Sequence, residues 1–248
     1  MPPRVRPSYP GDTLNDGGDL IMRAMCDVFE AIETRRAVRA FRPDPVPRET
    51  VEAILDLAAR APSGSNIQPW KVWVVTGAAK ERLSQRILAA HEADDPEQQE
   101  EYPYYPDRWE EPYLARRRQL GLALYGLLGI AKGDNAAMKR QFGRNYSFFG
   151  APVGLILTID RSLNQGSWFD LGTFLQSILL AARGFGLDTC PQQAFAKFNR
   201  LIRAELAIPE SQVVACGIAL GHADPQAPEN QLHTPREPRA AFATFVES

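Results

Sequence analysis

The most informative stretch of this chain reads Ala61-Pro62-Ser63-Gly64-Ser65-Asn66-Ile67-Gln68-Pro69-Trp70. Its small residues would let the backbone approach a planar ligand closely. Its hydroxyl and amide side chains can form hydrogen bonds with ring heteroatoms. A plain turn before a strand uses the same residue types, so a turn and a ligand-binding loop are equally open at this point.

Regular elements are expected on both sides of this stretch. The apolar residues between Val51 and Ala58 follow the i, i+3, i+4, i+7 spacing of an amphipathic helix, and Pro47 suits its first turn. The run from Trp70 to Thr76 is rich in β-branched and aromatic residues, which predicts a strand. The stretch is therefore expected to connect a helix to a strand.

Over the rest of the chain, helical patterns outnumber strand patterns. The other expected helices are 24–36, 80–90, 114–131, 135–142, 169–183 and 197–206, and the other expected strands are 153–159 and 213–220. More than one helix separates successive strands, which favours an α+β fold over a regular βαβ wind. The helix 169–183 is apolar on most sides, which is typical of a buried helix and fits a place between subunits.

Two segments lack these patterns. Residues 1–22 are rich in Pro, Gly and Asp and are expected to form a flexible tail before a single domain of residues 23–248. Residues 92–111 form a long irregular segment that contains four large aromatic residues. Long irregular segments are usually either lids or disordered, and the aromatic residues here favour a lid.

Composition narrows the classes of protein that are possible. The chain has 248 residues, of which 44% are hydrophobic, enough for one large core. Its net charge of −2 gives no reason to expect a nucleic-acid or membrane partner. The N-terminal segment lacks the apolar region of a secretory signal, and Cys26, Cys190 and Cys216 lie far apart. We therefore expect a cytoplasmic protein without a membrane span, a disulfide framework or a metal site.

Three further clusters carry potential chemistry. Arg35-Arg36-Ala37-Val38-Arg39 ends a helix and can grip a phosphate, although a basic helix end that complements the macrodipole is favoured on composition alone. Residues 184–194 leave a buried helix and can turn backbone N–H groups toward a ligand, without the G-x-G-x-x-G spacing of a dinucleotide site. Arg236 in the C-terminal tail is the third feature, and a single arginine in a loop does not by itself indicate a binding site.

Taken together and in this order, the clusters resemble the nitroreductase family. R-R-x-x-R, a proline-rich extended segment, a helix and then P-S-G-S-N-x-Q-P-W before a strand form the hallmark order, which this chain shows from Arg35 to Trp70. Residues 148–153, residues 186–191 and Arg236 also match. The resemblance covers most of the chain and looks closest to the branch that contains nitrobenzoate reductases.

The resemblance implies an α+β fold with a mixed sheet flanked by helices, in an intertwined homodimer with one FMN at each subunit boundary. Arg35, Arg36 and Arg236 would hold the phosphate, and Arg39 would lie near the pyrimidine edge of the flavin. Ala37 stands where the family often has Ser, so one hydroxyl contact to the phosphate is expected to be missing. Ser63, Gly64, Ser65, Asn66 and Gln68 would line the ring and ribityl chain.

Gln193 and Ala194 would run along the ring edge near its reactive nitrogen. The full set of expected cofactor-binding residues is Arg35, Arg36, Ala37, Arg39, Pro62, Ser63, Gly64, Ser65, Asn66, Gln68, Pro191, Gln192, Gln193, Ala194 and Arg236. Arg39 is also the catalytic candidate, because a cation at the pyrimidine would favour the reduced flavin.

The implied reaction is reduction of a nitroaromatic compound, such as a nitrobenzoate-like acid, by a ping-pong mechanism with NADPH or NADH as electron donor. No side chain supplies electron pairs, whereas a flavin accepts hydride from a nicotinamide and passes it on. The same frame also supports enone reduction or dehalogenation, and a non-catalytic FMN-binding protein is the alternative outside enzymes. A hydrolase is disfavoured because the chain has no G-x-S-x-G elbow.

Overall fold

The computed structural model describes residues 26–247, so the tail expected over residues 1–22 lies outside the described part. The α-helices are α1 (Val28–Thr34), α2 (Arg48–Ala58), α3 (Gly77–Glu92), α4 (Tyr113–Leu127), α5 (Asn135–Gly143), α6 (Gln165–Gly184) and α7 (Asn199–Leu206). The strands are β1 (Trp70–Thr76), β2 (Val153–Asp160), β3 (Asp188–Gln192) and β4 (Gln212–Gly221). Short 3-10 helices are η1 (Gly64–Asn66), η2 (Arg144–Gly150), η3 (Gln193–Phe198), η4 (Pro228–Gln231) and η5 (Arg239–Ala241). The expected α+β class is confirmed.

The four strands form one sheet in the order β1-β2-β4-β3, and each neighbouring pair is antiparallel. This corrects the expectation of a mixed sheet. Among the described residues, parallel pairing is limited to an isolated bridge between Ala37 and Thr189. The Val38 N–H donates to the Thr189 carbonyl there at 3.0 Å, which ties the segment after α1 to β3.

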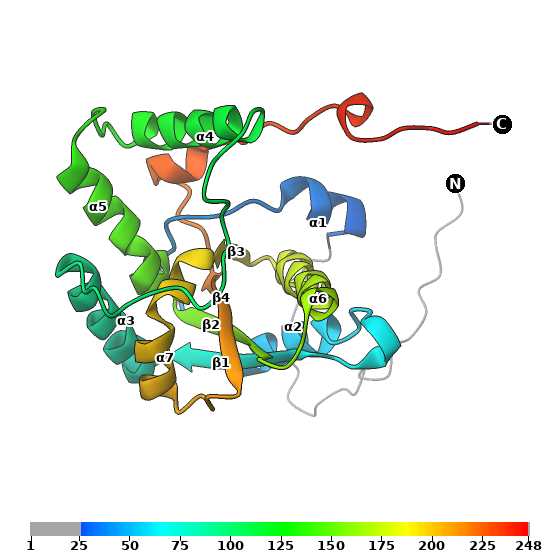
Figure 1. The fold of residues 1–248 in the computed structure, drawn as a ribbon, viewed down its shortest axis with the longest axis horizontal. Helices are drawn as coiled ribbons and strands as arrows, with labels where there is room; N and C mark the ends of the chain where they lie inside the picture. The colour runs from blue at the N-terminus through cyan, green and yellow to red at the C-terminus, as the bar shows by residue number, and fades with distance from the viewer. Residues whose placement is uncertain (1–25, 248) are drawn as a thin grey trace, which may run out of the picture.

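Helices cover both faces of the sheet, as Figure 1 shows. On one face, α2 and α6 pack against Leu155 and Leu157 of β2. On the other face, α3, η2 and α7 form a second core with Ile156. Burying an aliphatic side chain contributes about 1.5–3 kcal/mol. Because both faces of β2 are covered, the strand is a continuous apolar run rather than an alternating one.

A close approach sets the position of η3 against the sheet. A Cβ atom at Gly217 in β4 would lie 2.4 Å from Cδ2 of Phe195. The Phe195 ring also stacks on Phe148, with ring centroids 4.6 Å apart. Only glycine leaves room for this ring, and the packing fixes where the backbone at Gln193 and Ala194 lies.

Three boundaries differ from the sequence-based expectation. Helix α1 begins at Val28 because the Asp27 side chain accepts a hydrogen bond from the Glu30 N–H at 2.9 Å and so caps the helix. Helix α4 ends at Leu127, two residues before Gly129, whose φ of +64° leaves the helical region. The segment 184–194, for which no strand was expected, contains strand β3.

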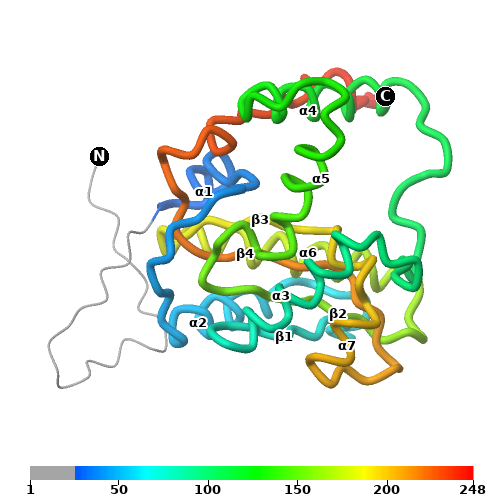
Figure 2. Tube along the Cα trace, turned by 90° about the vertical axis from the view of Figure 1, so that its left-hand side faces the viewer, coloured from blue at the N-terminus to red at the C-terminus, as the bar shows by residue number. Residues whose placement is uncertain are grey.

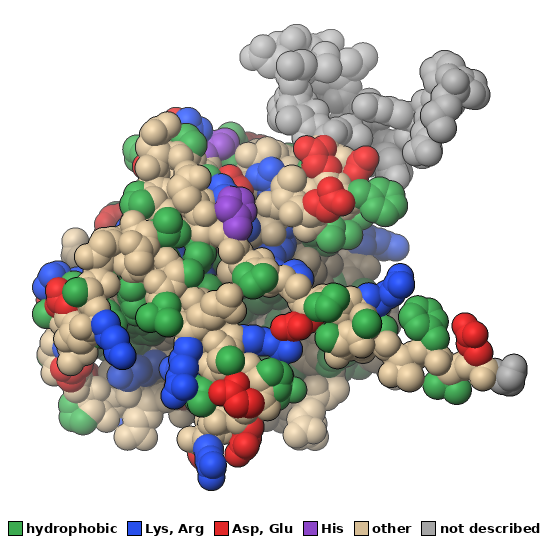
Figure 3. All heavy atoms as spheres, turned by 90° about the horizontal axis from the view of Figure 1, so that it is seen from above, with side chains coloured by type: hydrophobic (Ala, Val, Ile, Leu, Met, Phe, Trp, Pro, Cys, Tyr) green, Lys and Arg blue, Asp and Glu red, His purple; other side chains and the backbone are tan. Residues whose placement is uncertain are grey.

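Helix α4 lies apart from the sheet, on the same side of the molecule as the C-terminal tail (Figures 1 and 2). No residue of α4 is buried, and Leu122 is 67% exposed. The tail leaves the body of the chain, as the view from above in Figure 3 shows. Phe242 and Phe245 in this tail are more than 70% exposed, so the tail presents apolar side chains that its own chain does not cover.

Candidate cofactor site

A cavity of about 920 Å³ opens where α1 ends. Arg35 and Arg36 enter it directly after α1, and the C-terminal segment 232–236 brings Arg236 to the same place. Helix α6 contributes Gln176 and Arg183 to its wall. The structure therefore brings together the three arginines that the sequence assigned to a phosphate. We refer to Arg35, Arg36 and Arg236 as the guanidinium cluster.

The charges of the guanidinium cluster lack carboxylate partners within the described residues. Arg236 donates instead to Thr234 Oγ1 at 2.7 Å and to nearby backbone carbonyls. Burial, and after it the positive charge of Arg236, lower the pKa of Arg35. By contrast, Arg183 in the same wall is neutralised by Asp188 at 2.8 Å. Clustered cations with free donors fit a phosphate, because guanidinium groups bind phosphate oxygens bidentately.

Arg39 lies beyond the guanidinium cluster, on the segment that runs beside β3. Its backbone N–H donates to Asn230 Oδ1 at 2.8 Å, and its guanidinium donates to the Ala37 carbonyl at 3.3 Å. Burial raises the pKa of Cys190 in β3 to about 11, while the charges of Arg39 and Arg35 oppose that shift. Both arginines therefore lie close enough to the Cys190 side chain to act on it electrostatically.

The residues after Cys190 differ in how free their side chains are. Pro191 is exposed, and Ala194 is half-buried. Gln192 is buried, and its amide donates to the Asn145 carbonyl at 2.8 Å, so this side chain holds η2 against β3. Gln193 is half-buried and donates to the hydroxyl of Tyr102.

The loop of residues 62–68 has an unusual backbone. Ser65, Asn66 and Gln68 all have φ values between +50° and +56°, a region that side chains other than glycine rarely adopt. Helix α6 pins this loop: Asp170 Oδ2 accepts from the Gly64 N–H at 3.1 Å, and Thr173 Oγ1 donates to the Pro62 carbonyl at 3.1 Å. A backbone held in strained conformations by outside contacts is typical of a ligand-binding segment.

The 62–68 loop does not line the cavity of the guanidinium cluster. Both regions lie against α6, but Asp170 and Arg183 are 13 residues apart in that helix, which corresponds to about 20 Å along its axis. One chain therefore brings the expected phosphate residues together and keeps the expected ring residues apart from them.

Sequence reasoning missed the polar residues of α6 that serve these two regions. Asp170, Thr173 and Gln176 repeat every three residues on a helix that is otherwise largely apolar, and Arg183 follows two turns later. Residues at this spacing share one side of a helix. A polar stripe of this kind was the signal that could have identified them.

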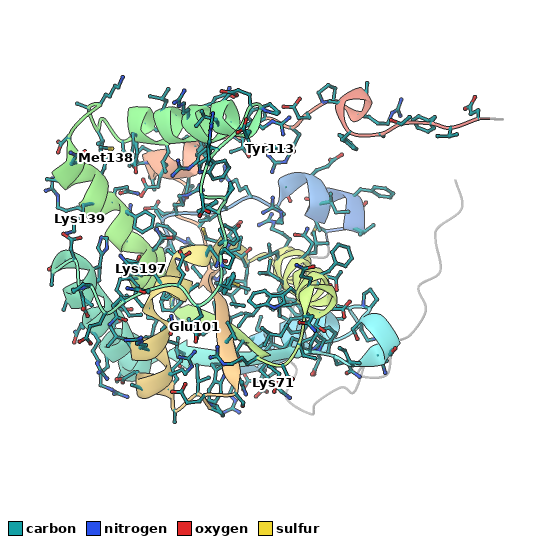
Figure 4. The ribbon with its side chains drawn as sticks, viewed as in Figure 1. Lys71, Glu101, Tyr113, Met138, Lys139 and Lys197 are labelled. Carbon is teal, nitrogen blue, oxygen red and sulfur yellow. The ribbon has the colours of Figure 1, made fainter. Side chains whose placement is uncertain are left out.

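The aromatic segment before α4 has the irregular form expected from the sequence, without helix or strand over residues 93–112. Its centre is fixed to the sheet: the centroid of the Tyr102 ring lies 4.4 Å from that of Trp168, and the Tyr102 hydroxyl donates to the Ala215 carbonyl. The residues that follow are open, with Tyr104 and Tyr105 about half exposed. Figure 4 labels Glu101, which lies within the segment, and Tyr113, which follows the segment at the start of α4.

Comparison with known proteins identifies the family. The profile of the nitroreductase family matches residues 32–222, and the chain belongs to that family. The chain is 45% identical to a 4-nitrobenzoate reductase of Pseudomonas putida over 226 residues, which cover 91% of this chain and 98% of the relative. It is 42% identical to a nitrobenzene nitroreductase of Ectopseudomonas oleovorans, over 88% of this chain and 96% of that one.

Among solved structures, the chain resembles the FMN-dependent nitroreductase NfnB from Mycobacterium smegmatis in complex with NADPH. The TM-score is 0.84 at 35% identity, over 88% of this chain and 97% of that one. Within residues 26–247, no helix combines the length and apolar character that crossing a membrane requires. The same part of the chain holds no group of three or more potential metal-binding side chains.

Proposed function

We propose that this protein is an FMN-dependent oxidoreductase that reduces nitroaromatic compounds, including nitrobenzoate-like acids, with NADPH or NADH. The observation that carries the proposal is the guanidinium cluster, three cations that share one cavity without carboxylate partners in the described chain. The similarity to nitrobenzoate and nitrobenzene reductases and to an FMN-dependent enzyme in complex with NADPH supports the same activity.

The guanidinium cluster holds the FMN phosphate in this proposal, with Gln176 of α6 in the same wall. Arg39, farther along the segment beside β3, lies at the pyrimidine edge of the flavin. Bound FMN supplies the hydride chemistry that the side chains lack. A cation at the pyrimidine favours the charge that appears there on reduction, so Arg39 raises the affinity for reduced FMN more than for oxidised FMN.

The flavin ring is bound by the 62–68 loop of a second copy of the chain, in a homodimer. If two α6 helices pack antiparallel about a two-fold axis, the loop end of one helix meets the cluster end of the other. Exposed apolar residues on α6 and on the neighbouring helix α1 support such packing: Phe169 of α6 is 78% exposed, and Phe29 of α1 is 73% exposed. Apolar side chains gathered on one side of a chain are typical of an interaction surface.

The remaining assignments follow from this arrangement. Residues 23–248 form one FMN-binding domain, which functions in the cytoplasm. The segment 93–112 acts as a lid, and its aromatic side chains wall the substrate pocket and exclude water.

The test is anaerobic reduction of the purified protein in the presence of FMN. We expect a yellow dimer with one FMN per chain, a flavin that NADPH or NADH bleaches, and a colour that 4-nitrobenzoate restores. Donor and acceptor use the same ring face in turn, as in a ping-pong mechanism. Double-reciprocal plots of initial rate against nicotinamide concentration, measured at several acceptor concentrations, should therefore be parallel lines. A colourless monomer that takes up no FMN contradicts the proposal.

The same assay separates the alternatives. Bleached flavin that is reoxidised by an enone or a halogenated tyrosine, and not by nitrobenzoate, assigns another reductive reaction to the site. Bound flavin that neither nicotinamide bleaches indicates a non-catalytic FMN-binding protein.

A further inference from the structure

Tyr102 connects the aromatic segment, the sheet and the turn after β3 through one hydroxyl group. The hydroxyl donates to the Ala215 carbonyl of β4 and accepts from the amide nitrogen of Gln193 in η3. The ring lies against Trp168 of α6, with centroids 4.4 Å apart. Three elements thus meet at a side chain that sequence reasoning counted only among the lid aromatics.

The directions of these hydrogen bonds are dictated by chemistry. A backbone carbonyl can only accept, so the Tyr102 proton points to Ala215. The Tyr102 oxygen can then only accept from Gln193, which must offer its NH₂ group. The carbonyl oxygen of the Gln193 side chain is left facing away from Tyr102. Within the described residues no donor contacts that oxygen, so it is a free acceptor.

The surroundings hold Tyr102 in place. Its neighbour Glu101 pairs with Arg161 at 2.7 Å and with Arg203. The Asn199 side chain donates to the Gln99 carbonyl at 2.6 Å. Burial also raises the pKa of Tyr102, so its hydroxyl keeps its proton through the neutral pH range. The donor to Ala215 is therefore permanent, and the orientation of the Gln193 amide is permanent with it.

We propose that Tyr102 is a positioning residue that fixes the Gln193 amide so that its carbonyl oxygen, and not its NH₂ group, faces the bound flavin. This inference rests on the proposed function and on the family resemblance, which implies that Gln193 lies along the ring edge near the reactive nitrogen of the flavin. That nitrogen is an acceptor in oxidised flavin and carries a hydrogen in reduced flavin. A carbonyl oxygen at this edge stabilises the reduced form, whereas an amide NH₂ would stabilise the oxidised form.

The experiment measures the midpoint potential of bound FMN and the affinity for oxidised FMN in Tyr102→Phe, in Gln193→Leu and in the double variant. Tyr102→Phe keeps the ring against Trp168 and removes the hydroxyl, so the Gln193 amide is free to turn. We expect the preference for reduced over oxidised FMN to fall about tenfold, which lowers the potential of this two-electron couple by about 30 mV. Tyr113→Phe, at an exposed tyrosine outside the 93–112 segment, is the matched control and should leave the potential unchanged.

The double variant separates positioning from a general structural role. If Tyr102 acts through Gln193, then Tyr102→Phe causes no further shift once Gln193 is Leu. An equal shift in both backgrounds, or an unchanged potential in Tyr102→Phe, overturns the inference while the wild type remains a working flavoprotein. A wild-type protein that binds no FMN instead overturns the proposed function, and the positioning role with it.

Discussion

Helix α6 serves two regions that differ in how complete they are within one chain. At its C-terminal end, the guanidinium cluster shares a cavity with Gln176 and Arg183, and segments from both ends of the described chain meet there. In its N-terminal half, Asp170 and Thr173 hold the 62–68 loop, whose residues 64–68 are all exposed. In the proposed dimer, one chain assembles the phosphate site, whereas the ring site needs the surface of the second chain to close it.

The largest expected effect is at the guanidinium cluster. Arg35→Ala and Arg236→Ala each remove charge-assisted hydrogen bonds, which costs about 1.5–3 kcal/mol, or roughly 10- to 150-fold in FMN affinity. Titration of apoprotein with FMN measures the loss. Arg82→Ala is the matched control, because Arg82 pairs with Glu205 on another surface. Unchanged affinity in both cluster variants would move the phosphate elsewhere.

Arg39 tests whether the segment that runs beside β3 is a structural anchor or an element that tunes the redox potential of the flavin. Arg39→Gln keeps much of the length and removes the charge, so oxidised FMN should bind with modest loss. The midpoint potential should fall by tens of millivolts, since about 30 mV corresponds to a tenfold change in a two-electron couple. A redox titration and an FMN binding curve, measured for wild type and variant, distinguish the two roles. Collapsed binding with an unchanged potential would make Arg39 a structural anchor.

A smaller effect is expected at the loop end of α6. Asp170→Ala removes the acceptor of the Gly64 N–H, which lies 3.1 Å from Oδ2. Losing one hydrogen bond costs about 0.5–1.5 kcal/mol, so FMN affinity should fall roughly 2- to 12-fold. Asp170→Asn keeps an oxygen acceptor and should retain most of the affinity. Equal losses in the two variants would show that the negative charge, rather than the loop contact, is what matters.

The smallest expected change is a factor of two in bound FMN. It tests most directly whether each site is formed by one chain or by two. A chain with Arg35→Ala and Arg236→Ala is co-expressed with a chain carrying Asn66→Ala and Gln68→Ala, and the mixed dimer is isolated with two affinity tags. If each site combines the cluster of one chain with the loop of the other, one of the two sites is intact and bound FMN returns to about half of the wild-type stoichiometry. No recovery would place the cluster and the loop of one site on the same chain.

Elements governed by neighbouring residues were predictable from the sequence. Strand β1 spans Trp70–Thr76 as predicted, because β-branched and aromatic residues in a short run between turn signals favour a strand. Helix α2 follows the apolar spacing of residues 51–58. Strand β3 was missed because Pro191 argues against a strand. The strand exists because β3 lies at the edge of the sheet, where a missing N–H is tolerated.

In the candidate site, too, some features could be predicted from the sequence and others depend on the folded structure. The Arg35–Arg39 and 62–68 segments indicated a flavin only through their resemblance, in residue type and order, to the nitroreductase family, since each segment alone fits a basic helix end or a plain turn as well. Contacts across long separations were not readable from the sequence: Arg35 and Arg236 meet only because α1, β3 and the C-terminal segment converge. The polar stripe of α6 and the Tyr102–Gln193 contact likewise depend on packing between distant segments. Local spacing fixes which groups a segment offers, but only the folded core fixes which of them face each other.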